Sequence, residues 1–269
     1  MGLNALVTGA SAGLGRELVV QLVRDRGMTV LVTARRRERL DELAANLPKG
    51  RVVVESGDLA DPAFRARLWS RAEQFPGGID LLVNNAGLGN YAKFSVQDED
   101  AIRRMVEVNL MALIDLTQKA SRHMTTRGSG QIIEISSVLG FIGLPYSAVY
   151  VATKHAVNGL VKSLCNELRG TGVRVWAACP GRTESEFSQV ALGHPGAADP
   201  VARGAATETV VRAIVRELDG RKTFLFPTWD AWAAAALAHW LPGPFDWTMR
   251  HWIGPRFAAE IAHARKTPG

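Results

Sequence analysis

Short apolar runs alternate with longer amphipathic segments along most of this chain, and this alternation constrains the fold more than any other feature. Residues 28–33 and 173–178, for example, are largely apolar rather than apolar at every second position. Strands of this kind are buried on both faces, which is typical of a parallel sheet with helices on each side. The sequence therefore predicts a doubly wound α/β domain.

The same patterns divide the chain into elements. The predicted strands are residues 3–8, 28–33, 51–55, 79–83, 131–135, 173–178 and 223–226, and the predicted helices are 14–26, 36–47, 61–75, 98–125, 147–169 and 207–218. Residues 183–206 are rich in Gly, Ala and Pro, and a loop of this length is more often a lid or substrate-binding segment than a mere connection. We expect one domain over residues 1–228 and a helical extension over 229–269 that is not a domain of its own.

Composition excludes several classes of protein. The 269 residues include only two cysteines, Cys165 and Cys179, with no paired-cysteine or His/Cys cluster, so neither disulfides nor a metal site are indicated. The start of the chain carries no secretory pattern, and no apolar run is long enough to span a membrane. The net charge of +6 comes without a basic block interleaved with aromatic residues, which argues against nucleic acid. We expect a cytoplasmic protein.

A glycine-rich loop separates the first strand from the first helix. Its sequence is Thr-Gly-Ala-Ser-Ala-Gly-Leu-Gly over residues 8–15. Gly9 permits a tight turn, while Gly13 and Gly15 let the backbone approach a pyrophosphate and let the helix pack on the sheet. The helix N-terminus favours the same anion. The expected cofactor-binding residues of this loop are Gly9, Ser11, Ala12, Gly13, Leu14 and Gly15.

The end of the second strand indicates which dinucleotide binds. No acidic residue lies between Thr33 and Arg37, whereas Arg35 and Arg36 are available for a 2′-phosphate. The pattern favours NADP(H) over NAD(H). The alternative is a solvated basic helix start, which the helix dipole would oppose.

Two further motifs follow the third and fourth strands. Asp58, followed by Leu59, is placed either to accept a hydrogen bond from an adenine amino group or simply to form a turn. After the fourth strand, the amides and small residues of Asn84-Asn85-Ala86-Gly87 can hold strand ends together and line a cofactor groove.

A serine, a tyrosine and a lysine form the candidate catalytic group. Tyr150 and Lys154 are four residues apart on a predicted helix and share a face, and Ser137 lies thirteen residues before the tyrosine. A fixed ammonium lowers the pKa of a phenol, so we expect Lys154 to bring Tyr150 into use near neutral pH. Taken alone, the pair is also compatible with a surface lysine beside a half-buried tyrosine.

As a set, these motifs resemble the short-chain dehydrogenase/reductase family. The resemblance covers about residues 3–227 and includes the glycine loop, Asp58, the Asn84–Gly87 motif, Asn109, the Ser-Tyr-Lys group and Pro180-Gly181. It implies a Rossmann fold with seven parallel strands, a homodimer or homotetramer, and hydride transfer between nicotinamide and a carbonyl or alcohol.

The resemblance also implies residue roles. Tyr150 would be the general acid of reduction and general base of oxidation, and Lys154 would lower its pKa and bind the nicotinamide ribose. Ser137, favoured over Ser136 by its spacing, would hold the substrate oxygen, and Asn109 would anchor a water relay to Lys154. The nicotinamide would be bracketed by Pro180, Gly181 and Thr183. Ala12 departs from many NADPH-using members, which carry Arg or Lys there, so the cofactor preference depends mainly on Arg35 and Arg36.

Three segments are expected to surround the substrate. They are residues 87–94, residues 141–146 and the 183–206 loop, and their apolar and aromatic side chains favour a bulky apolar ketone, aldehyde or acyl compound. The expected wall residues are Tyr91, Phe94, Phe141, Leu144, Tyr146 and Phe187. For each aromatic side chain taken singly, a position in the core is an equally open alternative. Arg182 is the candidate for binding a substrate carboxylate.

The extension after residue 228 contains five of the seven tryptophans. Trp229, Trp232, Ala233, Ala236, Leu237 and Trp240 can form one helical face, which ends at Pro242. Three interpretations remain open: packing over the substrate pocket or a subunit interface, peripheral membrane contact through residues 229–253, and plain core.

The function predicted from the sequence is NADPH-dependent reduction of a small-molecule carbonyl. Two alternatives share the fold: an NADP-binding regulatory or scaffolding protein, and an alcohol dehydrogenase that uses NADP⁺ in the oxidative direction.

Overall fold

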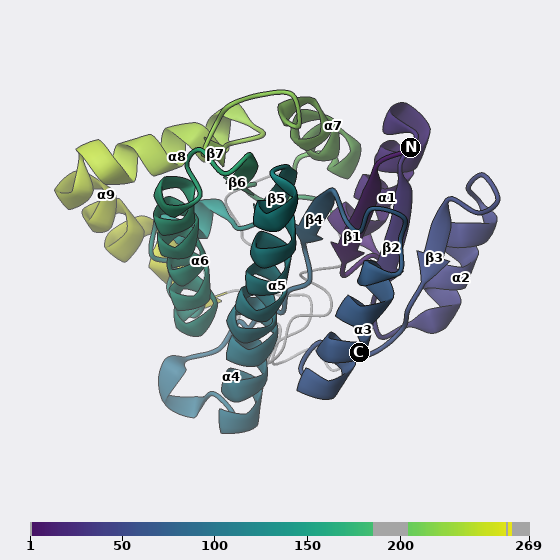
Figure 1. Cartoon of the computed structure of the whole chain (residues 1–269). Helices are drawn as coiled ribbons and strands as arrows, with labels where there is room; N and C mark the ends of the chain where they lie inside the picture. The colour runs from purple at the N-terminus through teal and green to yellow at the C-terminus, as the bar shows by residue number, and fades with distance from the viewer. Residues whose placement is uncertain (1, 185–203, 257, 260–269) are drawn as a thin grey trace.

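A seven-stranded parallel sheet forms the centre of the computed structural model, which describes residues 2–184, 204–256 and 258–259 (Figure 1). The strand order is β3-β2-β1-β4-β5-β6-β7. The strands are β1 (Asn4–Thr8), β2 (Thr29–Thr33), β3 (Val52–Val54), β4 (Leu81–Asn84), β5 (Gly130–Ile135), β6 (Val173–Ala178) and β7 (Phe224–Leu225). The predicted doubly wound sheet is confirmed, and every predicted strand is present.

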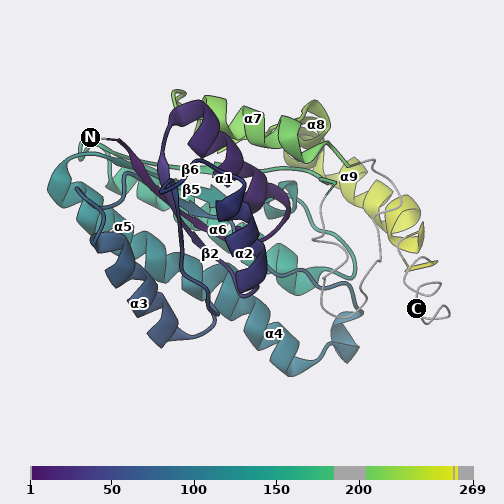
Figure 2. The same cartoon turned by 90° about the vertical axis from the view of Figure 1, so that its right-hand side faces the viewer.

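Helices cover both faces of the sheet (Figures 1 and 2). One face packs against α1 (Gly13–Arg26), α2 (Arg37–Ala45) and α7 (Thr207–Glu217), and the other against α3 (Pro62–Glu73), α5 (Ala112–Arg127) and α6 (Ala148–Glu167). In β1, Ala5 and Val7 belong to the first core and Leu6 to the second. Burial on both faces explains why the strands are apolar runs without strict alternation.

The chain changes direction between β1 and β4. It builds the sheet outward from β1 through β2 to β3, then returns to place β4 on the other side of β1. A crevice is expected outside the carboxyl ends of two such strands. Thr8 joins these ends, because its Oγ1 accepts hydrogen bonds from the backbone N–H groups of Asn85 at 2.9 Å and Ala86 at 3.0 Å.

The predicted helix over residues 98–125 is not uniform. It consists of α4 (Glu99–Val106), one π-helical turn, η2 (Glu107–Met111), and α5. Such a turn contains one residue more than an α-turn and is frequent at functional sites. Asn109 lies within it, so the sequence prediction missed a local irregularity at a candidate site residue.

The C-terminal extension is helical and lies at the margin of the molecule (Figures 1 and 2). It consists of α8 (Trp229–Trp240), α9 (Pro242–Thr248) and the π turn η4 (Met249–Ile253). Within α8, Ala231 and Ala235 are buried, whereas Trp229 and Trp240 are 77% and 76% exposed. The apolar face predicted for this helix is therefore exposed to solvent. Its large side chains are not core residues, so the third interpretation of the extension is wrong for them. Within the described residues, no helix has the length and apolarity needed to cross a bilayer.

Candidate active site

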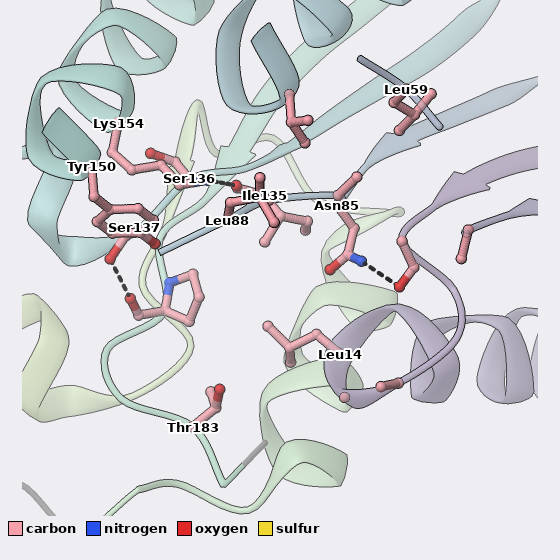
Figure 3. Close-up of a pocket in the computed structure, with 18 of the residues that line it drawn as sticks. Leu14, Leu59, Asn85, Leu88, Ile135, Ser136, Ser137, Tyr150, Lys154 and Thr183 are labelled. Atoms are coloured by element: carbon pink, nitrogen blue, oxygen red, sulfur yellow. Dashed lines mark hydrogen bonds between the residues drawn. The ribbon is translucent and has the colours of Figure 1, made fainter. Parts of the chain in front are cut away.

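A cavity of about 510 Å³ opens where β1, β4, β5 and β6 end (Figure 3). This volume is within the range usual for ligand sites. The predicted site residues that line it are Gly9, Ser11, Ala12, Gly13, Leu14, Arg35, Arg36, Asp58, Leu59, Asn85, Ala86, Gly87, Tyr91, Ser137, Leu144, Tyr150, Lys154, Pro180, Gly181 and Thr183. Gly15 and Asn109 lie behind this lining, and Phe187 is outside the described residues.

The glycine loop passes so close to the end of β4 that side chains would not fit. Gly9 has φ +68°, and a Cβ atom there would lie 2.8 Å from Asn85 Nδ2. A Cβ atom at Gly15 would lie 2.4 Å from the carbonyl oxygen of Gly9. Asn85 fixes this approach, since its Nδ2 donates to the carbonyl of Thr8 at 2.8 Å. Gly15 thus serves the packing of α1 on the loop rather than direct contact with a ligand.

The N-terminus of α1 faces the cavity without a side-chain cap from its N-cap residue. Ala12, at the N-cap position, makes no side-chain hydrogen bond, and the first turn contains no acidic residue. The backbone N–H groups at this end have no partner within the helix and carry the positive end of its dipole. Together with Gly9, this uncapped end forms a cradle suited to a pyrophosphate.

Two arginines after β2 extend the cationic side of this cradle. Arg35 is exposed and lines the cavity. Arg36 is half-buried, and its Nη2 donates to Ser11 Oγ at 3.2 Å, which holds its guanidinium against the glycine loop. This arrangement fits the predicted contact with a 2′-phosphate.

Asp58 is paired with an arginine that the sequence did not identify. Arg104 of α4 lies 2.6 Å from Asp58 Oδ2, and the N–H of Ala60 donates to Asp58 Oδ1 at 3.0 Å. Although burial acts in the opposite direction, the bond from Arg104 holds the pKa of Asp58 below its usual value. Asp58 is therefore ionised beside the cavity, and its contact with an adenine remains a prediction.

Asn109 connects the loop after β4 to α6. Its Oδ1 accepts from the N–H of Leu88 at 2.7 Å, and its Nδ2 donates to the carbonyl of Leu88 at 2.9 Å and to Thr153 Oγ1 at 3.3 Å. Leu88 lines the cavity, and Thr153 lies on the helix that carries Tyr150. The π turn thus places this amide where it fixes two cavity walls. A water relay to Lys154 remains a prediction.

The two serines after β5 have different partners. Ser136 Oγ donates to Asn158 Oδ1 at 2.6 Å, within α6. Ser137 faces the cavity, where its Oγ accepts from the N–H of Leu139 at 3.1 Å and contacts the carbonyl of Pro180 at 3.5 Å (Figure 3). Because the hydroxyl of Ser136 is bound elsewhere, the geometry favours Ser137 as the serine that contacts a substrate.

Tyr150 and Lys154 project from successive turns of α6 to the same end of the cavity as Ser137 (Figure 3). Lys154 Nζ lies 5.6 Å from the centre of the Tyr150 ring and donates to the carbonyl of Ile135 at 2.7 Å. The sequence prediction that the pKa of Tyr150 is lowered is wrong for the chain alone. Burial raises this pKa and Tyr91 adds to the rise, while the hydrogen bond with Ser137 acts against it. Burial also lowers the pKa of Lys154 to about 8.

Comparison with known proteins decides the family. The family model for short chain dehydrogenases matches residues 3–193. The chain belongs to the short-chain dehydrogenase family. It is 36% identical to farnesol dehydrogenase from Aedes aegypti over 195 residues, which cover 69% of this chain and 79% of that protein.

Solved short-chain dehydrogenases share the fold over most of their length. A short-chain dehydrogenase from Sphingobium yanoikuyae in complex with NADPH has a TM-score of 0.76 and 31% identity, and covers 88% of this chain and 94% of its own. A short-chain dehydrogenase/reductase from Burkholderia phymatum in complex with NAD has a TM-score of 0.79 over 88% of this chain and 93% of its own. At 21% identity, this second likeness concerns the fold alone.

The substrate end of this short-chain dehydrogenase differs in part from the sequence prediction. Tyr91 and Leu144 line the cavity, and Tyr146 packs beside them. Phe94 and Phe141 are not wall residues: Phe94 is 67% exposed, and Phe141 packs against Phe224 and Phe226 with ring centres 5.3 Å apart. Arg182 lines the cavity and remains the candidate for a substrate anion.

Several cavity residues carried no sequence signal. They are Ala34, Gly57, Arg104, Val108, Ile135, Val138 and Leu139. Most are apolar and resemble core residues, and the position of Arg104 on a helix far along the chain from Asp58 becomes evident only in the folded structure. Within the described residues, no group of three or more His, Cys, Asp or Glu side chains is arranged to hold a metal ion.

Proposed function

We propose that this short-chain dehydrogenase reduces an apolar carbonyl compound with NADPH, with Tyr150 as general acid. The observation that supports this most is the convergence of Ser137, Tyr150 and Lys154 at one end of a cavity whose other end is the glycine cradle (Figure 3). Fold and family support oxidoreductase activity, and the Arg35–Arg36 pair favours NADP(H).

The residues present fit a dinucleotide phosphate. A Cβ atom at Gly9 would clash with Asn85 and Ala86, so glycine keeps the loop in this position, and the first turn of α1 offers its N–H groups beside Ser11. Arg35 and Arg36 supply cations where a 2′-phosphate would lie, and Pro180 and Gly181 line the opposite end. When bound, NADPH supplies the hydride.

The role of Tyr150 as proton donor follows from the environment of its side chain. Burial raises the pKa of this phenol, so it stays protonated at neutral pH and is suited to donate its proton to a carbonyl oxygen that is becoming an alkoxide. Ser137 supplies a second hydrogen bond to that oxygen, and the Lys154 ammonium stabilises the phenolate that remains.

The predicted substrate class follows from the wall opposite these groups. Tyr91, Leu144 and Tyr146 form a partly buried apolar cluster at this end. Apolar walls with a few fixed polar groups are typical of sites that bind apolar ligands and orient one oxygen. A bulky ketone or aldehyde fits this combination better than a small charged substrate.

The test is NADPH depletion over a panel of ketones, aldehydes, quinones and 3-oxoacyl thioesters, with Tyr150→Phe as the matched variant. Phenylalanine keeps the ring and removes only the hydroxyl, so we expect kcat to fall about 100- to 10,000-fold. Binding of NADPH, followed by its fluorescence, should persist. Full activity of Tyr150→Phe would refute the assigned mechanism. Tight NADPH binding without turnover of any carbonyl would instead favour a regulatory role.

A further inference from the structure

A buried carboxylate lies directly behind the reactive end of the cavity. Glu134, on β5, is 0% exposed. Its Oε1 accepts from Thr117 Oγ1 at 2.7 Å and from Asn84 Nδ2 at 3.2 Å, whereas its Oε2 has no hydrogen-bond partner among the described residues. A carboxylate enclosed in this way is costly unless a charge nearby compensates it.

The cation that fits this requirement is Lys154. Side chains alternate along β5, so Glu134 projects to the face opposite Ile133 and Ile135, which is the face that α5 and α6 cover. Lys154 reaches the same strand from α6 and donates to the carbonyl of Ile135, the residue next to Glu134. The charges of Glu134 and Lys154 act on each other: each favours the ionised form of the other.

The other groups around this pair are neutral at neutral pH. Asn84 of β4 and Thr117 of α5 bind Glu134 but do not titrate. Cys179, after β6, also acts on Lys154, but burial raises the pKa of its thiol to about 12. Tyr150, one turn away on α6, has a raised pKa as well. Among the groups found to act on Lys154 in the described structure, Glu134 is the one that ionises near neutrality, because burial raises its pKa to about 7.

We propose that Glu134 is a positioning residue for catalysis, a buried counter-charge that keeps Lys154 protonated beside Tyr150. Burial draws the pKa of Lys154 down to about 8, and the carboxylate acts against this effect. Without it, the lysine would lose its proton close to the working pH, and the phenolate of Tyr150 would lose its stabilising cation. This inference deepens the proposed function and rests on it.

The central variant is Glu134→Gln, which keeps the side-chain shape and an acceptor for Thr117 but removes the charge. We expect the ionisation midpoint of Lys154 to fall by about one pH unit. It can be measured in the cofactor-free protein by NMR of ¹³C-labelled lysine side chains, with Lys154→Met used to assign the signal. The chain has only seven lysines, so the signals are few. In the reduction reaction, the alkaline limb of the kcat/KM profile should move down by the same amount.

Thr117 provides a second, milder perturbation and its control. Thr117→Val removes the hydroxyl that donates to Glu134, which makes ionisation of the carboxyl harder, so the Lys154 midpoint should fall by a smaller amount. Thr117→Ser keeps the donor and should leave the midpoint in place. The valine variant also tests the inference if Glu134→Gln does not fold.

An unchanged Lys154 midpoint in Glu134→Gln, or in Thr117→Val if the former does not fold, would overturn the inference. A purely structural role would lower the thermal stability of the variants without moving this midpoint. The lysine titration needs neither substrate nor cofactor. A fully active Tyr150→Phe enzyme would therefore count against the proposed function, whereas an unmoved lysine midpoint would count against the role of Glu134.

Discussion

Arg35 offers the sharpest test of how the cavity chooses its cofactor. The residue is exposed, lines the cavity and follows the end of β2, whereas Arg37, two residues later, does not line the cavity and forms an ion pair with Asp41 at 3.3 Å. Arg35→Ala therefore removes a cation that lines the cavity. Arg37→Ala removes a cation from the same basic segment that does not line the cavity. The second substitution is the matched control.

The expected magnitude follows from the exposure of Arg35. A hydrogen bond to a charged partner contributes about 1.5–3 kcal/mol, and solvent screening at an exposed site places Arg35 at the lower end. A loss of about 1.5 kcal/mol corresponds to a roughly tenfold change. NADH has no 2′-phosphate, so only the kcat/KM for NADPH should fall, mainly through KM.

The assay measures kcat/KM for NADPH and NADH with one carbonyl substrate, at low and at high salt. Arg35→Ala should lower the NADPH-to-NADH ratio about tenfold at low salt and less at high salt. Arg37→Ala should leave the ratio within about twofold. An unchanged ratio in Arg35→Ala, or equal effects of both substitutions, would refute the assignment of Arg35 to the 2′-phosphate.

Two further predictions concern the site and its scaffold. Ser137→Ala should lower kcat about 100-fold, because one hydrogen-bond donor to the reacting oxygen is lost. The affinity for NADPH, measured by fluorescence, should change little. An equal loss of NADPH affinity would mean that Ser137 binds the cofactor instead. Gly15→Ala should lower the melting temperature and weaken NADPH binding, because its Cβ would meet the Gly9 carbonyl at 2.4 Å. Gly159→Ala is the control, because Gly159 is helical and nothing lies within 4 Å of the added Cβ. This substitution should raise the melting temperature slightly. A lowered melting temperature would contradict this account of the two glycines.

Much of the architecture could be predicted because it depends on local patterns. Strand positions followed from apolar runs, and the position of the glycine loop at the cavity followed from Gly9 and Gly13 between a strand and a helix. The choice of Ser137 followed from spacing, and the structure adds a reason in the bond between Ser136 and Asn158.

What could not be predicted depends on contacts between distant segments. Arg104 meets Asp58 across 46 positions of sequence, and Lys154 binds a backbone carbonyl, which no residue type reveals. The sign of the shift in the Tyr150 pKa was wrong because spacing gives the position of a cation but not the depth of burial. Phe94 and Phe141 were misplaced for a related reason, since the path of a loop decides which side chains face a cavity.

The exposed face of α8 has a spectroscopic consequence. Trp69 and Trp176 are buried, whereas the other five tryptophans are all in the extension and are 54–77% exposed. The intrinsic fluorescence of this protein should therefore report mainly on the extension and its polarity rather than on the core. Anything that covers this face, whether a second subunit, a lipid surface or another protein, should shift the emission to shorter wavelength without a label.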